Sequence, residues 1–277
     1  MKQRFVCASS LCWSLLALTG CTAQIVEHSG ATHSAPLSGA APFVPEQLQF
    51  SRVRQARAAT ANSLEELFRQ RGWSYPAAEM FLRVFKRERE LEVWVRSAGS
   101  DRFDLLRKYP ICALAGVLGP KRIVGDAQVP EGFYTIDLFN PVSSYHLSLR
   151  IDYPNQHDRN AAPRGRSLGG DIFIHGGCKS DGCLAITDEA IRELYWLAVT
   201  TRGTGEKTIA VHIFPTRFTE PSYQRQTKRA FQDSPELLAF WETLRPGYDY
   251  FERTRRLPPI SVDARGRYRV NQGVAIR

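Results

Sequence analysis

Short runs of apolar, β-strand-type residues interrupted by polar positions recur along much of the middle of the chain. Three such runs follow one another, at residues 80–86, 91–96 and 103–111. In the second run, Val93 and Val95 fall on one side of an extended chain, and Glu92 and Arg96 fall on the other. The charged segment 87–90 between the first two runs is typical of a turn. We therefore predict an antiparallel meander of three strands.

Strands are also predicted further along the chain, at residues 145–152, 172–175 and 208–215, and a hairpin is predicted from 260–263 and 267–270. Residues 116–134 contain closely spaced glycines and prolines, which favour special backbone angles and indicate a shaped loop. A longer polar loop, residues 153–170, precedes the strand at 172–175 and is a candidate substrate rim.

Helices are predicted where apolar residues recur three or four positions apart. The first covers residues 63–72 and opens with a capping-box pattern. The second begins after Thr187, and the third begins at Ser234. We expect Pro246-Gly247 to break the third helix before a short helix near residues 248–251. Strands outnumber helices, so the pattern predicts an α+β, β-rich fold with peripheral helices.

Composition supports a folded core, since the chain has fifteen Phe, ten Tyr and five Trp and is 43% hydrophobic. The formal net charge of +9 would suit nucleic acid, anionic lipid or an acidic polymer as a partner. The Lys and Arg residues are scattered and no nucleic-acid-binding motif accompanies them, so we expect no nucleic-acid partner.

The first twenty residues have the pattern of a secretory signal. Two basic residues precede an apolar stretch, residues 5–18, that is short for a transmembrane helix. The following Leu18-Thr19-Gly20-Cys21 resembles a bacterial lipoprotein cleavage box, which implies cleavage before Cys21 and attachment of lipid to its thiol. The alternative is an ordinary signal peptide with an incidental cysteine. Thr22 implies sorting to the outer membrane, so we expect a periplasm-facing, lipid-anchored protein.

These patterns divide the chain into four regions. Residues 1–20 are the predicted signal peptide. Residues 21–59 are a predicted flexible tether, because small residues and proline dominate 29–42. Residues 60–220 are the predicted main domain, and residues 221–277 are a predicted helical extension with a hairpin, packed on the same domain.

The six cysteines are Cys7, Cys12, Cys21, Cys112, Cys178 and Cys183. Two would leave with the signal and one would carry lipid, so an odd number remains outside the cytosol, which suggests one reactive thiol and one disulfide. We take Cys183 as the reactive cysteine, which leaves Cys112 and Cys178 as the disulfide pair. Two alternatives stay open: a Cys178–Cys183 bond, and a zinc site made by His175 with these two cysteines. That zinc site would lack a fourth ligand, so we expect neither a metal nor another cofactor.

The segment that ends in Cys183 carries the candidate chemistry. A strand-like run ends at His175, two glycines follow, and a polar loop closes with Ser180-Asp181-Gly182-Cys183. A cysteine nucleophile needs a neighbouring base and backbone N–H groups that face the developing oxyanion. The glycines allow the loop to bring Cys183 back beside His175.

The remaining residues of this segment have supporting roles in our interpretation. The N–H groups of Asp181, Gly182 and Cys183 are the candidate oxyanion donors, and Ser180 belongs to the same turn. Either Asp181 or a backbone carbonyl near Gly176 would fix the imidazole tautomer, and we prefer the carbonyl.

His175-Gly176 followed by Ser180-x-Gly182-Cys183 resembles the active-site motif of the bacterial L,D-transpeptidase catalytic domain. Further segments agree in order along residues 60–260: Tyr109-Pro-Ile-Cys112, Gly119-Pro-Lys121, Gly125-Asp126, Pro130-Glu-Gly-Phe-Tyr134, Tyr153-Pro-Asn155 with Asp158-Arg159, Thr187-Asp-Glu189 and His212-Ile-Phe-Pro215. Together they are similar to one branch, the murein L,D-transpeptidase-like periplasmic proteins. The resemblance implies an L,D-transpeptidase-like β-sandwich or barrel core in residues 60–220.

The resemblance also implies acyl transfer on peptidoglycan stem peptides, with Cys183 as nucleophile and His175 as base. Tyr153, Arg159, Arg164 and Arg166 are then candidate substrate-binding residues. The three arginines suit the free carboxylates of the stem, because guanidinium groups pair well with carboxylates.

The chain departs from the commoner motif of the family in two ways. Asp181 stands where most members have a histidine, and the spacing from His175 to Cys183 is shorter. Both features fit the named branch, which includes hydrolases that detach an outer-membrane lipoprotein from peptidoglycan. We therefore expect a transpeptidase, with a hydrolase (an L,D-carboxypeptidase or a lipoprotein-releasing enzyme) as the alternative, and a non-catalytic peptidoglycan-binding lipoprotein as a third.

Overall fold

The computed structural model of the protein describes residues 40–219 and 222–271. Its helices are α1 (Ala40–Gln47), α2 (Ser51–Gln70), α3 (Gln156–Asn160), α4 (Asp188–Gly203), a π-helix (Ser222–Lys228) and α5 (Pro235–Thr254). Its strands are β1 (Glu79–Phe85), β2 (Glu90–Arg96), β3 (Asp104–Pro110), β4 (Ala113–Leu114), β5 (Gly132–Asn140), β6 (Ser148–Ile151), β7 (Phe173–His175), β8 (Leu184–Ala185), β9 (Ala210–Phe214), β10 (Ile260–Val262) and β11 (Tyr268–Val270).

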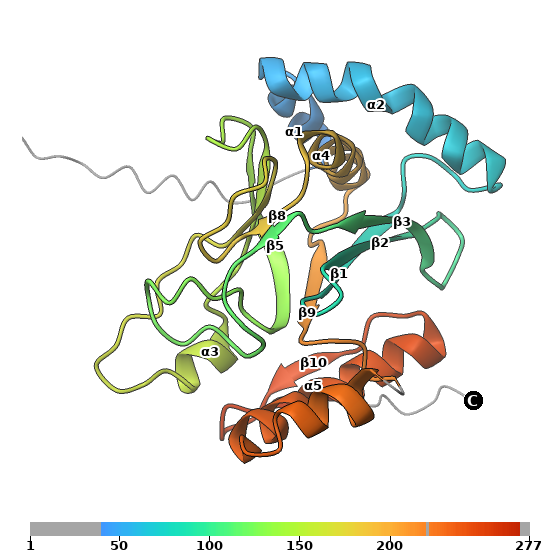
Figure 1. Ribbon diagram of the computed structural model, residues 1–277. Coiled ribbons are helices and arrows are strands. Elements are labelled where there is room, and N and C mark those ends of the chain that lie inside the picture. The colour runs from blue at the N-terminus through green and yellow to red at the C-terminus, as the bar shows by residue number, and fades with distance from the viewer. Residues whose placement is uncertain (1–39, 220–221, 272–277) are drawn as a thin grey trace, which may run out of the picture. The chain divides into compact units, whose positions relative to one another are not determined.

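Nine strands form one sheet in the order β3-β2-β1-β9-β5-β6-β7-β8-β4, and β10 and β11 form a separate hairpin (Figure 1). The pairs β1–β9 and β7–β8 are parallel, whereas the other pairs of the large sheet are antiparallel. The predicted β1–β2–β3 meander and the C-terminal hairpin are confirmed. So is the α+β, β-rich fold with peripheral helices.

The two faces of β1 pack against different helices. Leu82 and Val84 belong to the main hydrophobic cluster, which also contains the buried face of α4. Phe81, which points the other way, packs against Phe251 of α5 with ring centroids 4.9 Å apart. Figure 1 accordingly shows α1, α2 and α4 on one side of β1 and α5 with β10 on the other. The sheet is therefore covered on both faces at this point, which fixes the register of its strands.

The prediction that residues 21–59 form a flexible tether is wrong for residues 40–59, where α1 covers Ala40–Gln47 and α2 follows after three residues. Helix α2 begins at Ser51, so the predicted helix start and domain boundary near residue 60 are also wrong. Its buried residues recur at helical spacing from Val53 and Ala56 to Leu64 and Phe68. This apolar stripe packs on α4, which stabilises a helix that local composition alone did not indicate. Residues 21–39 and the predicted signal peptide at 1–20 lie outside the described residues.

The predicted break at Pro246-Gly247 is wrong as well, because α5 continues through it to Thr254. Trp241, Leu244, Tyr248 and Phe251 form one buried stripe across the proline, and tertiary packing of that stripe overrides the local signal. A Cβ at position 247 would lie 2.7 Å from the ring of Phe133, so glycine allows the helix to approach the sheet. Among the described helices, none is both long and apolar enough to cross a membrane.

Candidate active site

Strand β7 ends at His175 and lies between β6 and β8 in the sheet. In the parallel β7–β8 ladder, His175 is opposite Ala185, so the same register continued backwards places Cys183 opposite Phe173. The Phe173 N–H donates to Cys183 Sγ at 3.4 Å, in agreement with this register. Side chains two residues apart on a strand face the same way, so the imidazole and the thiol lie on one face of the sheet.

The turn before Cys183 is closed by Ser180 and packed from outside by the 116–131 loop. Ser180 Oγ donates to the Cys183 carbonyl at 2.7 Å and accepts from Gly182 N at 3.3 Å. Gly182 has φ +119°, and a Cβ there would lie 3.3 Å from the carbonyl oxygen of Gln128. The turn therefore requires glycine at 182, both for its backbone angle and for the approach of the neighbouring loop. Asp181 is exposed on the outside of the turn.

The imidazole of His175 is buried and held by the backbone. Its Nδ1 lies 2.6 Å from the carbonyl oxygen of Gly176, which can only accept, so Nδ1 carries the hydrogen and donates. This tautomer leaves the lone pair on Nε2 available to accept a proton. The carbonyl that we preferred at the sequence level occupies the position, and the exposed Asp181 does not.

The electrostatics of the two groups favour a neutral resting pair. Burial lowers the pKa of His175, with an opposing effect from the Gly176 carbonyl. Burial also raises the pKa of the Cys183 thiol, and the nearby carboxylates of Asp171 and Asp181 raise it further. The Phe173 N–H and the Lys121 ammonium act in the opposite direction. The resting site therefore holds a protonated thiol, which donates to the Asp171 carbonyl at 3.7 Å, and a neutral imidazole on the same face of the sheet that can accept a proton.

We expect alkylation of Cys183 by iodoacetamide to be slow at pH 7 and to accelerate only above the usual thiol pKa of about 8.5, because the raised pKa leaves little thiolate at neutral pH. The rate is measured across pH 5–10 by mass spectrometry of the peptide that contains Cys183, with glutathione as an internal reference. A rate that already levels off below pH 8 would mean a resting thiolate and would contradict the neutral pair.

Tyr145 contacts the imidazole directly, and sequence analysis did not single it out. Its ring stacks on His175 with centroids 4.6 Å apart and planes 28° apart. The Tyr145 carbonyl also accepts from Gly176 N at 3.1 Å, and Arg52 of α2 donates to the carbonyls of Ser143 and His146 in the same loop. Only the fold brings these segments together, since no local pattern marks Tyr145 as a neighbour of the base.

We expect Tyr145→Ala to lower kcat/KM by about threefold to tenfold, because the imidazole loses a stacking partner worth about 0.5–1.5 kcal/mol. Tyr145→Phe retains the ring and should stay within about twofold of wild type. The measurement is turnover on isolated peptidoglycan as a function of pH. Equal losses in the two variants would assign the effect to the hydroxyl and not to stacking.

Cys112 and Cys178 form a disulfide, with Cα atoms 5.4 Å apart. This bond overturns the Cys178–Cys183 alternative and removes Cys178 as a thiolate ligand from the zinc alternative. It ties the loop after β7 to the segment between β3 and β4, and Cys183 remains a free, half-buried thiol. Within residues 40–219 and 222–271, no group of three His, Cys, Asp or Glu side chains is placed to hold a metal ion.

The comparisons with known proteins decide the family. The sequence model of the L,D-transpeptidase catalytic domain (YkuD) matches residues 79–213. The chain is 37% identical over 195 residues to the protein named "Putative L,D-transpeptidase YafK" of Escherichia coli K12, across 70% of this chain and 74% of that protein. The protein of the same name from Escherichia coli O157:H7 matches equally. The chain belongs to the L,D-transpeptidase family.

Solved structures give weaker likenesses. The helical cell shape determining protein Pgp2 from Campylobacter jejuni is 19% identical with a TM-score of 0.39, over 67% of this chain and 73% of that one. Bd1075 from Bdellovibrio bacteriovorus is 20% identical with a TM-score of 0.36, over 64% and 61%. The L,D-transpeptidase motif from His175 to Cys183 lies inside the residues that the family model matches.

The structure places Tyr153 in the core and not at an exposed substrate-binding position. Its ring is buried, and its hydroxyl contacts the backbone carbonyls of Lys121 and Leu168 at 3.3 and 3.4 Å. It therefore supports the 116–131 loop. Arg159, Arg164 and Arg166 are exposed, and Arg159 donates to the nearby Pro154 carbonyl. In the part of the chain that the structure describes, no contact links Arg164 or Arg166 to the catalytic pair.

The 116–131 loop beside the L,D-transpeptidase motif is held by internal contacts, as its glycines and prolines predict. Asp126 accepts from Lys121 Nζ and from the N–H groups of Arg122, Ile123 and Gln128. Gln128 Nε2 donates to the carbonyls of Val117 and Gly119. The loop therefore presents Lys121 near the thiol as a fixed charge.

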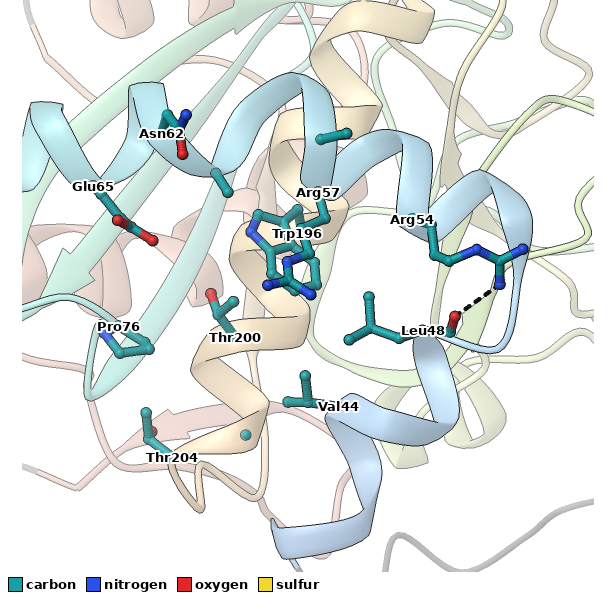
Figure 2. Close-up of a pocket in the computed structure, with 13 residues that line it drawn as sticks. Val44, Leu48, Arg54, Arg57, Asn62, Glu65, Pro76, Trp196, Thr200 and Thr204 are labelled. Atoms are coloured by element: carbon teal, nitrogen blue, oxygen red, sulfur yellow. Dashed lines mark hydrogen bonds between the residues drawn. The ribbon is translucent and has the colours of Figure 1, made fainter.

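A cavity of about 890 Å³ lies between α1, α2 and α4, apart from the L,D-transpeptidase motif. Figure 2 shows Val44 of α1 and Leu48, which directly follows α1, facing Trp196 of α4. The guanidinium of Arg57 in α2 lies 5.8 Å from the centre of the indole ring. None of the residues that line it is a candidate catalytic residue.

Proposed function

We propose that this protein is a peptidoglycan-modifying cysteine enzyme that acts as an L,D-transpeptidase on diaminopimelate-containing stem peptides. The observation that carries the proposal is the arrangement of one base and one thiol on the same face of the sheet, with the Gly176 carbonyl holding His175 in the tautomer that can accept a proton. Family membership supports acyl transfer on this polymer as the chemistry.

The proposed reaction begins with the neutral pair. Cys183 Sγ attacks a carbonyl carbon of diaminopimelate in the stem as its proton passes to His175 Nε2. Backbone N–H groups of the Ser180–Cys183 turn face the oxyanion of the tetrahedral intermediate. The intermediate collapses to a thioester, and the imidazolium returns the proton to the departing amine.

The second step decides between transferase and hydrolase. An amine of a neighbouring stem that attacks the thioester regenerates the thiol and leaves an amide cross-link, whereas water leaves a carboxylate. We place transpeptidation first. Hydrolysis, as an L,D-carboxypeptidase or as release of a peptidoglycan-linked lipoprotein, remains the alternative, and Asp181 in the motif favours it because it matches the branch that contains such hydrolases.

We further propose that the enzyme works in the periplasm, anchored to the outer membrane through lipid on Cys21. The disulfide between Cys112 and Cys178 supports a compartment outside the cytosol, because disulfides persist in oxidising surroundings. Basic residues give the chain a net charge of +9, which suits an acidic polymer such as peptidoglycan.

The test uses the full chain and its Cys183→Ala variant with isolated peptidoglycan that carries its bound lipoprotein. Products are identified by mass spectrometry. Loss of terminal D-alanine together with new cross-links is the expected result. Shortened stems or freed lipoprotein without new cross-links would assign the protein to the hydrolases. Identical products from the two proteins would sink the catalytic proposal and leave a binding lipoprotein.

A further inference from the structure

We propose that a second cavity, between α3, α5 and the β10–β11 hairpin, binds a free carboxylate of the stem peptide through Arg122, Arg265 and Arg267. The choice of ligand rests on the proposed function, since it names the part of that substrate which this site would hold. The site differs from the exposed Arg159, Arg164 and Arg166, to which sequence analysis assigned the same task.

The cavity has a volume of about 280 Å³, enough for a small part of a peptide. Six of the residues around it carry the proposal: Arg122, His157, Asn160, Phe240, Arg265 and Arg267. They come from the 116–131 loop, α3, α5 and the turn of the hairpin. The concave shape distinguishes this cluster of arginines from scattered surface charge, because it can desolvate a bound anion on several sides.

The hairpin wall of the cavity is fixed in place by His157. Its Nδ1 lies 2.6 Å from the Gly266 carbonyl, to which it donates, and its ring stacks between Phe240 and Tyr268 with centroids 5.2 and 4.3 Å away. Burial lowers the pKa of His157 to about 4, so the imidazole is neutral at physiological pH. A Cβ at Gly266 would lie 2.7 Å from Cβ of Asn160, which shows how closely the hairpin approaches α3.

Arg122 has guanidinium donors to spare. Its contacts with Asp158 Oδ1 and His157 Nε2 are both 3.5 Å long, beyond the usual range for a good N–H donor. The guanidinium also lies 5.4 Å from the centre of the Phe240 ring. Asp158 is satisfied without Arg122, since Tyr134 Oη and Asn155 N donate to its other oxygen at 3.0 and 3.1 Å. Arg122 can therefore bind a ligand carboxylate without breaking a strong hydrogen bond.

The hairpin supplies the second and third positive charges. Arg267 contacts Asp263 through Nε alone, at 3.2 Å, which leaves its terminal nitrogens available. The Arg265 guanidinium is exposed and has no side-chain partner among residues 40–219 and 222–271. The three arginines face two carboxylates, those of Asp158 and Asp263, so the cavity carries excess positive charge. Planar guanidinium groups pair bidentately with carboxylates, and the stem peptide offers several of them.

The cavity is connected to the catalytic pair through one short piece of chain. Arg122 directly follows Lys121, whose ammonium is near enough to Cys183 to lower the pKa of its thiol. The Asp126 carboxylate accepts from Lys121 Nζ and Arg122 N, so both residues are held by one anchor. A stem bound at Cys183 can therefore extend along this loop and place another carboxylate at Arg122.

The test measures the binding of a disaccharide tetrapeptide from isolated peptidoglycan to the full chain carrying Cys183→Ala, by calorimetry. Arg122→Gln and Arg265→Gln should each weaken binding about 10- to 100-fold, as expected for a lost charge-assisted hydrogen bond. Arg102→Gln removes the same charge from an exposed turn between β2 and β3 and should change the dissociation constant by less than about twofold. Amidating the carboxylates of the muropeptide should reproduce the loss and abolish the difference in affinity between the proteins with and without the Arg122→Gln substitution.

Equal affinities for all three glutamine variants, with melting temperatures unchanged, would overturn the site. The site would also be overturned if inorganic phosphate competed for Arg122 and amidation of the muropeptide had no effect on binding. The result is separable from the proposed function: turnover of peptidoglycan by the wild type with normal binding by Arg122→Gln would defeat this inference alone. Arginine-dependent binding without any Cys183-dependent turnover would defeat the catalytic proposal alone.

Discussion

Cys183→Ala is expected to lower the rate of peptidoglycan turnover by at least about 10⁴-fold, because Cys183 is the only free thiol among the described residues that could form the thioester. His175→Gln should lower kcat by about 10²- to 10⁴-fold, since glutamine can contact the Gly176 carbonyl but cannot accept the thiol proton. The two residues act as a unit, so the double variant should be no slower than Cys183→Ala. The measurement is the initial rate of product formation by mass spectrometry.

The matched control is Lys179→Ala, in the same turn. Lys179 is exposed, so its replacement should preserve both the rate and the melting temperature. If His175→Gln retained full activity while Cys183→Ala lost it, another group would have to be the base. Multiplicative losses in the double variant would indicate that the residues act independently, contrary to the geometry of one shared face.

Much of the site could be predicted because its parts are close in sequence. His175 ends a strand and Cys183 follows eight residues later. The glycines between them indicate a tight turn. Thr187 was likewise recognisable as an N-cap, and its side chain does accept from Ala190 N at 3.3 Å. In each case the determining interaction is local, so the residue types alone specify it.

The features that sequence analysis missed depend on contacts between distant segments. Residues 132–134, the start of β5, were assigned to the end of a loop. In the structure Phe133 pairs with His212 of β9, so the strand depends on a partner that is distant in sequence. Tyr145 contacts His175 across a separation of thirty residues. The N-terminal part of α2 was assigned to the tether because the small residues and prolines of 29–42 decided the interpretation of the whole segment. Its narrow apolar stripe becomes evident once α4 covers it.

The second large effect is expected from Glu131→Ala, which should lower the free energy of unfolding by about 3–5 kcal/mol. Glu131 is fully buried and accepts from Lys86 Nζ at 3.0 Å, Gly119 N at 2.7 Å and Trp241 Nε1 at 2.6 Å. Alanine would leave a buried ammonium without its countercharge and two donors without acceptors. Urea unfolding followed by circular dichroism measures the change.

Two comparisons separate burial from the ion pair itself. Glu66→Ala breaks a pair with Arg69 of similar geometry, 2.6 Å long, but on the exposed surface of α2, and should leave the unfolding midpoint nearly unchanged. Lys86→Met combined with Glu131→Leu removes both charges and should recover much of the lost stability. A double variant as unstable as Glu131→Ala would show that packing, and not the unpaired charge, causes the loss.

The pH dependence gives an independent test of the same cause. Burial already lowers the pKa of Lys86, and removal of Glu131 lowers it further because the countercharge is lost. Between the folded and unfolded pKa values the unfolded chain binds more protons, so stability rises with pH through that window. The deficit of Glu131→Ala should therefore shrink as the pH is raised toward 10. Glu131 also accepts from Gly119 N, near the start of the loop that carries Lys121 and packs against Gly182. The Glu131→Ala variant should therefore lose peptidoglycan turnover at temperatures where it is still folded.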